Sequence, residues 1–323
     1  MTQTMESQAT EAQGTLPRVN HWIDGKLVPS TSGKSRPVYN PATGEQTKTV
    51  DIASVEEIEA AVAAAKTAFP MWRATSLAKR ADIMFRIRNA FDSHRDVIAA
   101  IITSEHGKVL SDSAGELARG IENIEFACGV PQLQKGEFSE QVSGGVDVYS
   151  IRQPLGVVAG ITPFNFPAMV PMWMFGNAIA AGNTFVLKPS TVDPSVSLYL
   201  AQLMKEAGLP DGVFNVIQGD RVAVAGLTEH PDIAAVSFVG STPAAKRIYE
   251  TGSQAGKRVQ ALGGAKNHML VLPDADIGLT ADAAVSAGYG SAGERCMAIA
   301  TIVTVGEVHD PLIEAIKERL PQV

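Results

Sequence analysis

The chain has 323 residues, of which 45% are hydrophobic and 19% charged, and its formal net charge is −7. This composition is typical of a globular protein with enough chain for two domains or one large domain. The acidic balance gives no basic footprint for nucleic acid or for an anionic membrane surface, so we expect neither as a partner. Two cysteines are too few for a disulfide framework and favour a reducing compartment, which predicts a cytoplasmic protein.

The first part of the chain alternates turns with amphipathic helices. Residues 1–16 are polar and without Lys or Arg, which predicts a disordered tail rather than a secretory signal. Trp22–Val28 has the pattern of a hairpin that turns at Asp24-Gly25. Ser54 and Glu57 form a capping box at the start of an apolar stripe. Helical periodicity is found in four stretches, around 54–69, 76–91, 95–105 and 112–127.

Residues 137–152 contain two extended segments around a Ser-Gly-Gly turn. A two-stranded arm of this kind is marginally stable alone and usually pairs with another edge. We therefore expect an arm that takes part in homo-oligomerisation.

From Gly156 onward, short apolar strands alternate with helices. The predicted strands are 157–161, 184–188, 213–217, 234–239, 259–262 and 270–272. Such a series predicts an α/β fold with a doubly wound parallel sheet that is covered on both faces. Ligands of these sheets bind at the carboxyl ends of the strands, so the residues just after each strand are the informative ones.

Polar and glycine residues follow four of these strands. Asn165 lies between two prolines, and its amide could hold an oxyanion or simply stabilise a turn. Lys188 could reach a ribose hydroxyl or a phosphate, or be an ordinary surface lysine. Gly240-Ser241-Thr242 precedes a helix start and is suited to phosphate, although the chain has no G-x-G-x-x-G. Gly263-Gly264 permits close approach of the backbone to a ligand.

Cys296 lies in the glycine-rich segment 288–298, directly after Arg295. A neighbouring guanidinium favours the thiolate, which is the nucleophilic form of cysteine. The alternative is a buried structural cysteine, which is the role we expect for Cys128.

This ordered set of residues resembles the NAD(P)-dependent aldehyde dehydrogenase superfamily. More narrowly, segments 163–175, 264–268 and 293–298 look like those of the CoA-acylating methylmalonate-semialdehyde dehydrogenases. The likeness covers the chain from Val19 onward. It implies an NAD-binding domain over 17–262, which includes the arm, and the first part of an α/β catalytic domain over 263–323, with the remainder missing.

The resemblance implies a mechanism through a cysteine thioester. Cys296 is the implied nucleophile, Asn165 is the oxyanion donor, and NAD accepts the hydride. Positions that match cofactor contacts are Thr162, Phe164, Lys188, Ser241 and Gly263. A further pair of cofactor contacts, usually Glu-Arg in the family, is here Thr191 and Val192. No metal is expected.

Hydrolytic members of the superfamily carry a glutamate where this chain has Ala261. Alanine cannot activate water, which favours the thiol of coenzyme A as the deacylating nucleophile. Arg295, and by family likeness Arg119, would bind the substrate carboxylate, although Arg119 could equally be a surface partner of Glu116 or Glu122. The expected reaction converts methylmalonate semialdehyde or malonate semialdehyde to propanoyl-CoA or acetyl-CoA with loss of CO2.

Two other functions stay open at this stage. One is a hydrolytic aldehyde dehydrogenase, which would form NADH without coenzyme A. The other is an inactive fragment that only binds NAD or a full-length paralogue.

Overall fold

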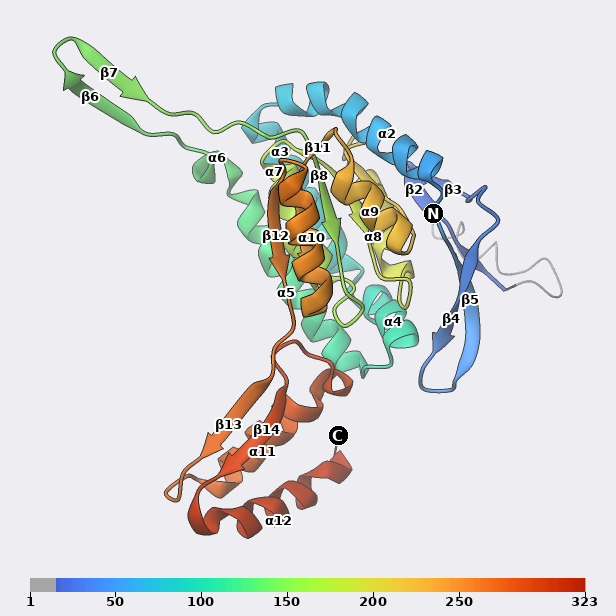
Figure 1. The fold of residues 1–323 in the computed structure, drawn as a ribbon, viewed down its shortest axis with the longest axis vertical. Helices are drawn as coiled ribbons and strands as arrows, with labels where there is room; N and C mark the ends of the chain where they lie inside the picture. The colour runs from blue at the N-terminus through green and yellow to red at the C-terminus, as the bar shows by residue number, and fades with distance from the viewer. Residues whose placement is uncertain (1–15, 323) are drawn as a thin grey trace.

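The computed structural model describes residues 16–322, so all but the last residue of the predicted tail lies outside the described part. Its centre is a seven-stranded sheet with the order β12-β11-β8-β9-β10-β2-β3 (Figure 1). Five of its strands are parallel: β8 (Val157–Ile161), β9 (Thr184–Lys188), β10 (Phe214–Val216), β11 (Ile233–Val239) and β12 (Arg258–Leu262). The predicted hairpin, β2 (His21–Ile23) and β3 (Lys26–Val28), extends the sheet antiparallel beyond β10.

Helices connect the parallel strands in a doubly wound pattern. They are α7 (Met169–Ala180), α8 (Ser195–Glu206), α9 (Arg221–Glu229) and α10 (Thr242–Gln254). The chain steps from β8 to β9 and β10 on one side, then crosses to β11 on the other side of β8. The strand order therefore reverses between β8 and β11, and such a switch point is where ligands bind.

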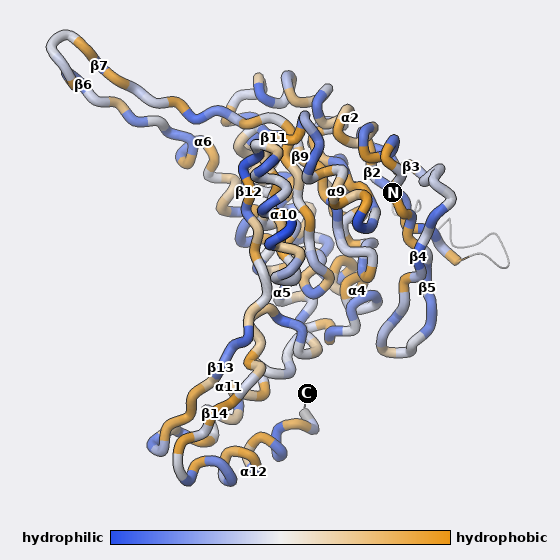
Figure 2. Tube along the Cα trace, in the orientation of Figure 1, coloured by the Kyte–Doolittle hydropathy of each residue, from blue (hydrophilic) through white to orange (hydrophobic). Residues whose placement is uncertain are grey.

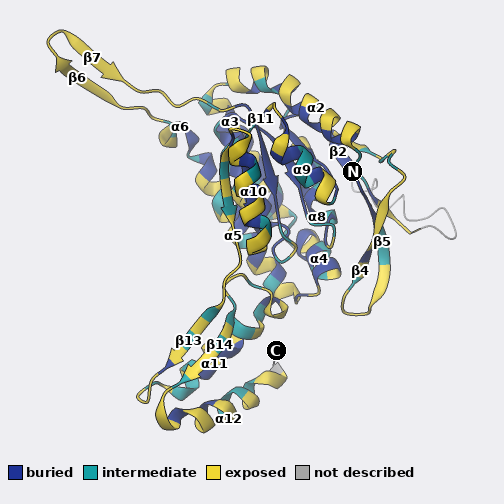
Figure 3. Ribbon diagram, in the orientation of Figure 1, coloured by how far each residue is buried: buried dark blue, intermediate teal, exposed yellow. Residues whose placement is uncertain are grey.

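Apolar layers cover both faces of the sheet, as predicted. On one face, α2 (Val55–Ala74), α9 and α10 pack against β8 and β11. On the other, α7 and α8 pack on the sheet, and α3 (Leu77–Ser93), α4 (Arg95–His106), α5 (Leu110–Cys128) and α6 (Val130–Leu133) lie outside them. Every residue of β8 and β9 is buried, which explains why β8 is entirely apolar and β9 is apolar at its centre (Figure 3).

Local signals placed the helix ends well. Ser54 accepts a hydrogen bond from the Glu57 amide while the Glu57 carboxylate accepts one from the Ser54 amide, so the capping box is confirmed. α4 ends where Gly107 adopts φ 88°, a left-handed conformation that glycine tolerates without strain.

A separate three-stranded sheet flanks the domain. Its order is β1 (Arg18–Val19), β5 (Glu45–Asp51), β4 (Ser35–Asn40). Asn40-Pro41 and Thr43-Gly44 form the turn of the β4–β5 hairpin.

The arm is a hairpin of β6 (Phe138–Ser143) and β7 (Val146–Tyr149) that projects from the body of the protein (Figure 1). All residues of both strands are exposed. Its role in oligomerisation stays a prediction.

The C-terminal lobe is built on a parallel pair, β13 (Asn267–Val271) and β14 (Ile299–Thr304), with α11 (Ile277–Tyr289) and α12 (His309–Arg319) packed against it. Our expectation that 270–272 continues the main strand series was wrong. After β12 the chain leaves the sheet at Gly263-Gly264, and β13 finds its partner in β14. Figure 2 shows apolar stretches on both strands of the pair.

Short 3-10 turns complete the lobe: η2 (Gly290–Gly293), η3 (Gly306–Val308) and η4 (Leu320–Gln322). Within residues 16–322, no helix has the length and hydropathy that crossing a membrane requires.

Candidate active site

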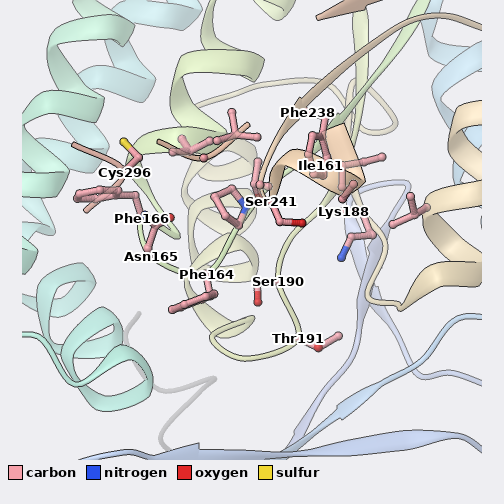
Figure 4. Close-up of a pocket in the computed structure, with 18 of the residues that line it drawn as sticks. Ile161, Phe164, Asn165, Phe166, Lys188, Ser190, Thr191, Phe238, Ser241 and Cys296 are labelled. Atoms are coloured by element: carbon pink, nitrogen blue, oxygen red, sulfur yellow. The ribbon is translucent and has the colours of Figure 1, made fainter. Parts of the chain in front are cut away.

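A cavity of about 860 Å³ opens at the carboxyl ends of β8, β9, β11 and β12. Eight of the residues singled out from the sequence line it: Thr162, Phe164, Asn165, Lys188, Thr191, Ser241, Gly263 and Cys296. Cys296 and Asn165 lie together at one end, and Lys188, Ser190 and Thr191 lie toward the other (Figure 4). The strand-end argument therefore located this cavity correctly.

The segment just before Cys296 forms a strained turn. Ser291, Ala292 and Gly293 all have left-handed φ values, of 53°, 56° and 74°. Each non-glycine residue in this region costs about 1–3 kcal/mol and persists only where its surroundings fix it. Asp112 on α5 supplies that restraint, because its carboxylate accepts hydrogen bonds from the Ser291 amide at 2.7 Å and from Arg295 Nη2 at 2.9 Å.

Asn165 contacts the same segment directly. Its Nδ2 donates a hydrogen bond to the carbonyl oxygen of Glu294 at 2.6 Å. Asn267 Nδ2 donates to the carbonyl oxygen of Cys296 at 3.1 Å. The amide proposed as oxyanion donor thus lies beside the nucleophile, with one of its protons already engaged.

A buried ion pair positions the Asn165 loop. Lys108 Nζ lies 2.8 Å from a Glu116 carboxylate oxygen, and both side chains are fully buried. Lys108 also donates to the Asn165 carbonyl oxygen at 2.7 Å and lies over the Phe166 ring at 4.4 Å. The other Glu116 oxygen accepts from the amides of Ala168, at 2.8 Å, and Met169, at 3.1 Å, where α7 begins.

Burial raises the pKa of Glu116, and the Lys108 charge together with the two amide donors opposes that rise. The pair therefore fixes the loop between β8 and α7 at both of its ends. Lys108 binds the Asn165 carbonyl oxygen, and Glu116 binds the amides where α7 begins. Sequence reasoning missed Lys108, which reads as an ordinary polar residue after a helix end.

Lys188, which lines the end of the cavity away from Cys296, is buried. Lys188 Nζ donates to the carbonyl oxygens of Pro189, at 2.6 Å, and Gly219, at 3.2 Å. Burial lowers the pKa of Lys188 to about 8. The Thr162 hydroxyl is also buried and lacks a hydrogen-bond partner within the described part of the chain.

Ser241 and Gly263, both near the start of α10, line the cavity. Ser241 is the N-cap of α10, and its hydroxyl makes no capping bond. A Cβ at Gly263 would come within 2.9 Å of Thr242 Oγ1, so only glycine fits there without a shift.

The Thr191-Val192 pair lies between two cavities. Thr191 lines both the main cavity and a smaller cavity of about 390 Å³, whereas Val192, which is 51% exposed, lines only the smaller one. Sequence reasoning missed Asp220 and Arg36, which also line the main cavity and lie 3.8 Å apart as an ion pair.

The predicted carboxylate-binding arginines lie outside both of these cavities in the described structure. Arg295 is paired with Asp112, as given above, and its side chain is 33% exposed. Arg119 is 70% exposed and pairs with Glu122 at 3.1 Å, which is the surface alternative considered for it. Their role in binding substrate stays a prediction.

Carboxylates do line the main cavity, although position 261 carries alanine. Glu294 and Asp220 both line the main cavity. Ala261 instead packs against the apolar layer around α10 and does not line the cavity. Glu294 is 3.2 Å from Nε2 of His106, a buried residue at the end of α4 that no sequence signal marked.

Burial shifts the pKa values of both members of this pair. It lowers the pKa of His106 to about 4, helped by the Lys108 charge and opposed by Asp112. Burial also raises the pKa of Glu294, against the effect of Lys108. His106 is therefore neutral at neutral pH.

Cys128 behaves as a core residue. It is buried, and burial raises the pKa of its thiol to about 11, so the thiolate is scarce. Cys296, in contrast, is exposed. Among residues 16–322, His, Cys, Asp and Glu side chains nowhere gather in threes as a metal site would require.

Known proteins share this arrangement over nearly the whole chain. The profile of the aldehyde dehydrogenase family matches residues 27–323. A malonate-semialdehyde dehydrogenase of Pseudomonas aeruginosa is 52% identical over 311 residues, which cover 96% of this chain and 61% of the relative. A mitochondrial acylating methylmalonate-semialdehyde dehydrogenase of Arabidopsis thaliana is 50% identical over 317 residues, or 97% of this chain and 52% of the relative.

Solved structures agree with the sequence relatives. A crystal structure from Sinorhizobium meliloti, described as a methylmalonate-semialdehyde dehydrogenase complexed with NAD, superimposes with a TM-score of 0.94 at 51% identity. The match covers 96% of this chain and 64% of that structure. The chain thus spans about three fifths of the length of these relatives. On the family profile and on this shared fold, the chain belongs to the aldehyde dehydrogenase family.

Proposed function

We propose that this chain carries the nucleophile and the dinucleotide site of an NAD-dependent, CoA-acylating dehydrogenase of malonate and methylmalonate semialdehydes. The observation that supports it most is a single cavity at the switch point of the sheet, lined at one end by Cys296 and Asn165 and at the other by Lys188. The relatives at about half identity bear these substrate names.

The chemistry starts at Cys296. Its thiolate attacks the aldehyde carbon, and the carbonyl oxygen becomes an oxyanion. The Asn165 amide, already beside the segment, would stabilise that charge together with the Cys296 amide. A donor of this kind typically contributes about 3–4 kcal/mol. NAD, when bound, supplies the hydride acceptor, and a thioester remains on Cys296.

The cavity residues fit a dinucleotide. Lys188 and Thr191 would face ribose hydroxyls, Ser241 and the start of α10 would face a phosphate, and the bare Gly263 backbone leaves room beside them. The unpartnered Thr162 hydroxyl gives a buried polar atom that a ligand can satisfy.

The thiol of coenzyme A then takes the acyl group from Cys296. A carboxylate β to the thioester carbonyl leaves as CO2, because the resulting carbanion delocalises into the thioester and is then protonated. Arg295 is the proposed partner of that carboxylate, which would compete with Asp112 for the guanidinium. Propanoyl-CoA and acetyl-CoA are the products.

Glu294 favours a second candidate, a hydrolytic dehydrogenase, because it places a carboxylate in the cavity. The two are separated by one assay on the purified chain. NAD binding is titrated first, and NADH formation from malonate semialdehyde is then measured with and without coenzyme A.

NADH formation that requires coenzyme A supports the acylating reaction, and NADH formation without it supports hydrolysis. NAD binding without any NADH would mean that the chain only binds the dinucleotide. Absence of NAD binding would refute the dinucleotide site. We further propose that the exposed β6–β7 arm pairs with a second copy of the chain, which the mass of the particle in solution would test.

A further inference from the structure

Glu294 stands two residues before Cys296, and the mechanism above does not use it. Its side chain lines both the main cavity and the smaller cavity of about 390 Å³. The side chain is 41% exposed, so it meets the cavity as well as the protein. A carboxylate beside a nucleophilic thiol is either a proton acceptor or an opposing charge, and these two roles have different consequences.

His106 lies next to this carboxylate on the protein side. The imidazole is fully buried, and Nε2 lies 3.2 Å from a Glu294 oxygen. Its ring packs on Phe164, with centroids 6.1 Å apart. Neither ring nitrogen has a hydrogen bond within the described residues, and a buried imidazole without one is costly. The neutral ring keeps one N–H, which can turn toward the carboxylate.

The backbone around the pair is fixed by two other side chains. Asn165 holds the Glu294 carbonyl oxygen at 2.6 Å, and Asp112 holds the guanidinium of Arg295 at 2.9 Å. The Cα atoms of residues 294 and 296 are at most about 7 Å apart, because two residues span no more than that. Both residues also line the main cavity.

We propose that Glu294, positioned by His106, is the base that takes the proton of the Cys296 thiol as the sulfur attacks. The proton passes from Sγ to a carboxylate oxygen, and the sulfur electron pair forms the bond to the carbonyl carbon. The π electrons of the carbonyl move to its oxygen. After the hydride has left for NAD, the thioester remains and the proton on Glu294 is released to solvent. This inference deepens the proposed function and rests on it.

Other charges surround the pair and must be distinguished from it. Lys108 lies at the Asn165 loop, and Asp112 and Arg295 lie at the turn that contains Ser291. Glu105 and Arg36 line the smaller cavity. If Glu294 acted only as a nearby charge, it would oppose formation of the negatively charged thiolate. Removing it would then speed the reaction of Cys296 at neutral pH, whereas removing a base would slow it.

The test is the rate at which iodoacetamide alkylates Cys296 in the whole chain, followed by mass spectrometry from pH 5.5 to 9.5. In this reaction the sulfur forms a bond to carbon, iodide leaves and Glu294 takes the proton. The wild type should react measurably below the ordinary thiol pKa. Glu294→Gln should lose this low-pH reactivity, with a fall of about tenfold at pH 7. Glu318→Gln, an equal change of charge at an exposed site, should match the wild type.

His106→Gln should shift the pH at which the low-pH alkylation rate is half-maximal, but it should not abolish that reactivity, because the Glu294 carboxylate remains. A Glu294→Gln rate at pH 7 that equals or exceeds the wild-type rate overturns the proposal, even if the His106 variant does not fold. The alkylation needs neither NAD nor coenzyme A. A failure of NAD binding would therefore refute the proposed function while leaving this measurement readable.

Discussion

The buried Lys108–Glu116 pair gives the most quantitative prediction. Lys108→Met removes the partner of a fully buried carboxylate. Breaking such a pair typically costs about 3–5 kcal/mol, because an uncompensated charge is left in the interior. The lost hydrogen bond to the Asn165 carbonyl and the contact with Phe166 act in the same direction. At about 2 °C per kcal/mol, the melting temperature should fall by ~6–10 °C.

A double-mutant cycle separates the pair from general damage. Glu116→Gln keeps acceptors for the Ala168 and Met169 amides but leaves Lys108 unpaired. The double variant removes both charges, so it should be more stable than the sum of the single changes predicts. We expect a coupling of about 2–3 kcal/mol in urea unfolding.

Lys79→Met, an exposed lysine on α3, serves as the control and should stay within about 0.5 kcal/mol of the wild type. The reasoning is refuted if Lys108→Met falls in the same range as this control. It is also refuted if the two single changes at the pair simply add.

Four further predictions concern Lys188, Thr191 and Arg295. Burial lowers the pKa of Lys188 to about 8, so its charge is lost as pH rises through 8. The affinity for NAD, measured by fluorescence titration, should fall over that range. Lys188→Met should bind NAD weakly, and its affinity should not change with pH there. Because of the same shift, Lys188 loses its proton at a lower pH in the folded state than in the unfolded state. The Lys188 contribution to stability therefore rises with pH from about 8 to 10, and this rise should be absent from thermal melts of Lys188→Met. Thr191→Glu should tighten NAD binding about tenfold through a carboxylate–ribose hydrogen bond, whereas Thr191→Gln should not; equal affinities would exclude this contact. Arg295→Ala should lower kcat/KM for malonate semialdehyde roughly 10–100-fold and spare propanal, and an equal loss on both substrates would count against carboxylate binding.

Much of the fold could be predicted because its signals are local. The run that became β8 is entirely apolar, and β9 has three consecutive apolar residues at its centre, as expected for strands covered on both faces. The capping box at Ser54 marks the start of α2, and Gly107 marks the end of α4, so each signal is readable from the local sequence. The strand-end rule then brought Asn165, Lys188 and Ser241 to one cavity without any measured distance.

The errors lie where partners are distant in sequence. β13 has the same apolar pattern as the strands of the main sheet, and only its pairing with β14 reveals that it belongs to another lobe. The carboxylates that reach the cavity, Glu294 and Asp220, are visible in the sequence, but nothing local says which way their side chains point.

The turn between α4 and α5 has the largest influence on the site and no chemical signature of its own. His106, Lys108 and Asp112 fall within seven residues of the chain, nearly two hundred residues before Cys296. Each contacts a different part of the site: the Glu294 carboxylate, the Asn165 carbonyl and the strained turn at Ser291. Because the left-handed residues before Cys296 cost energy that only such contacts offset, the nucleophile is positioned by this helix corner as much as by its own loop. A change at Asp112 should therefore alter the reactivity of Cys296 even though Asp112 does not line the cavity.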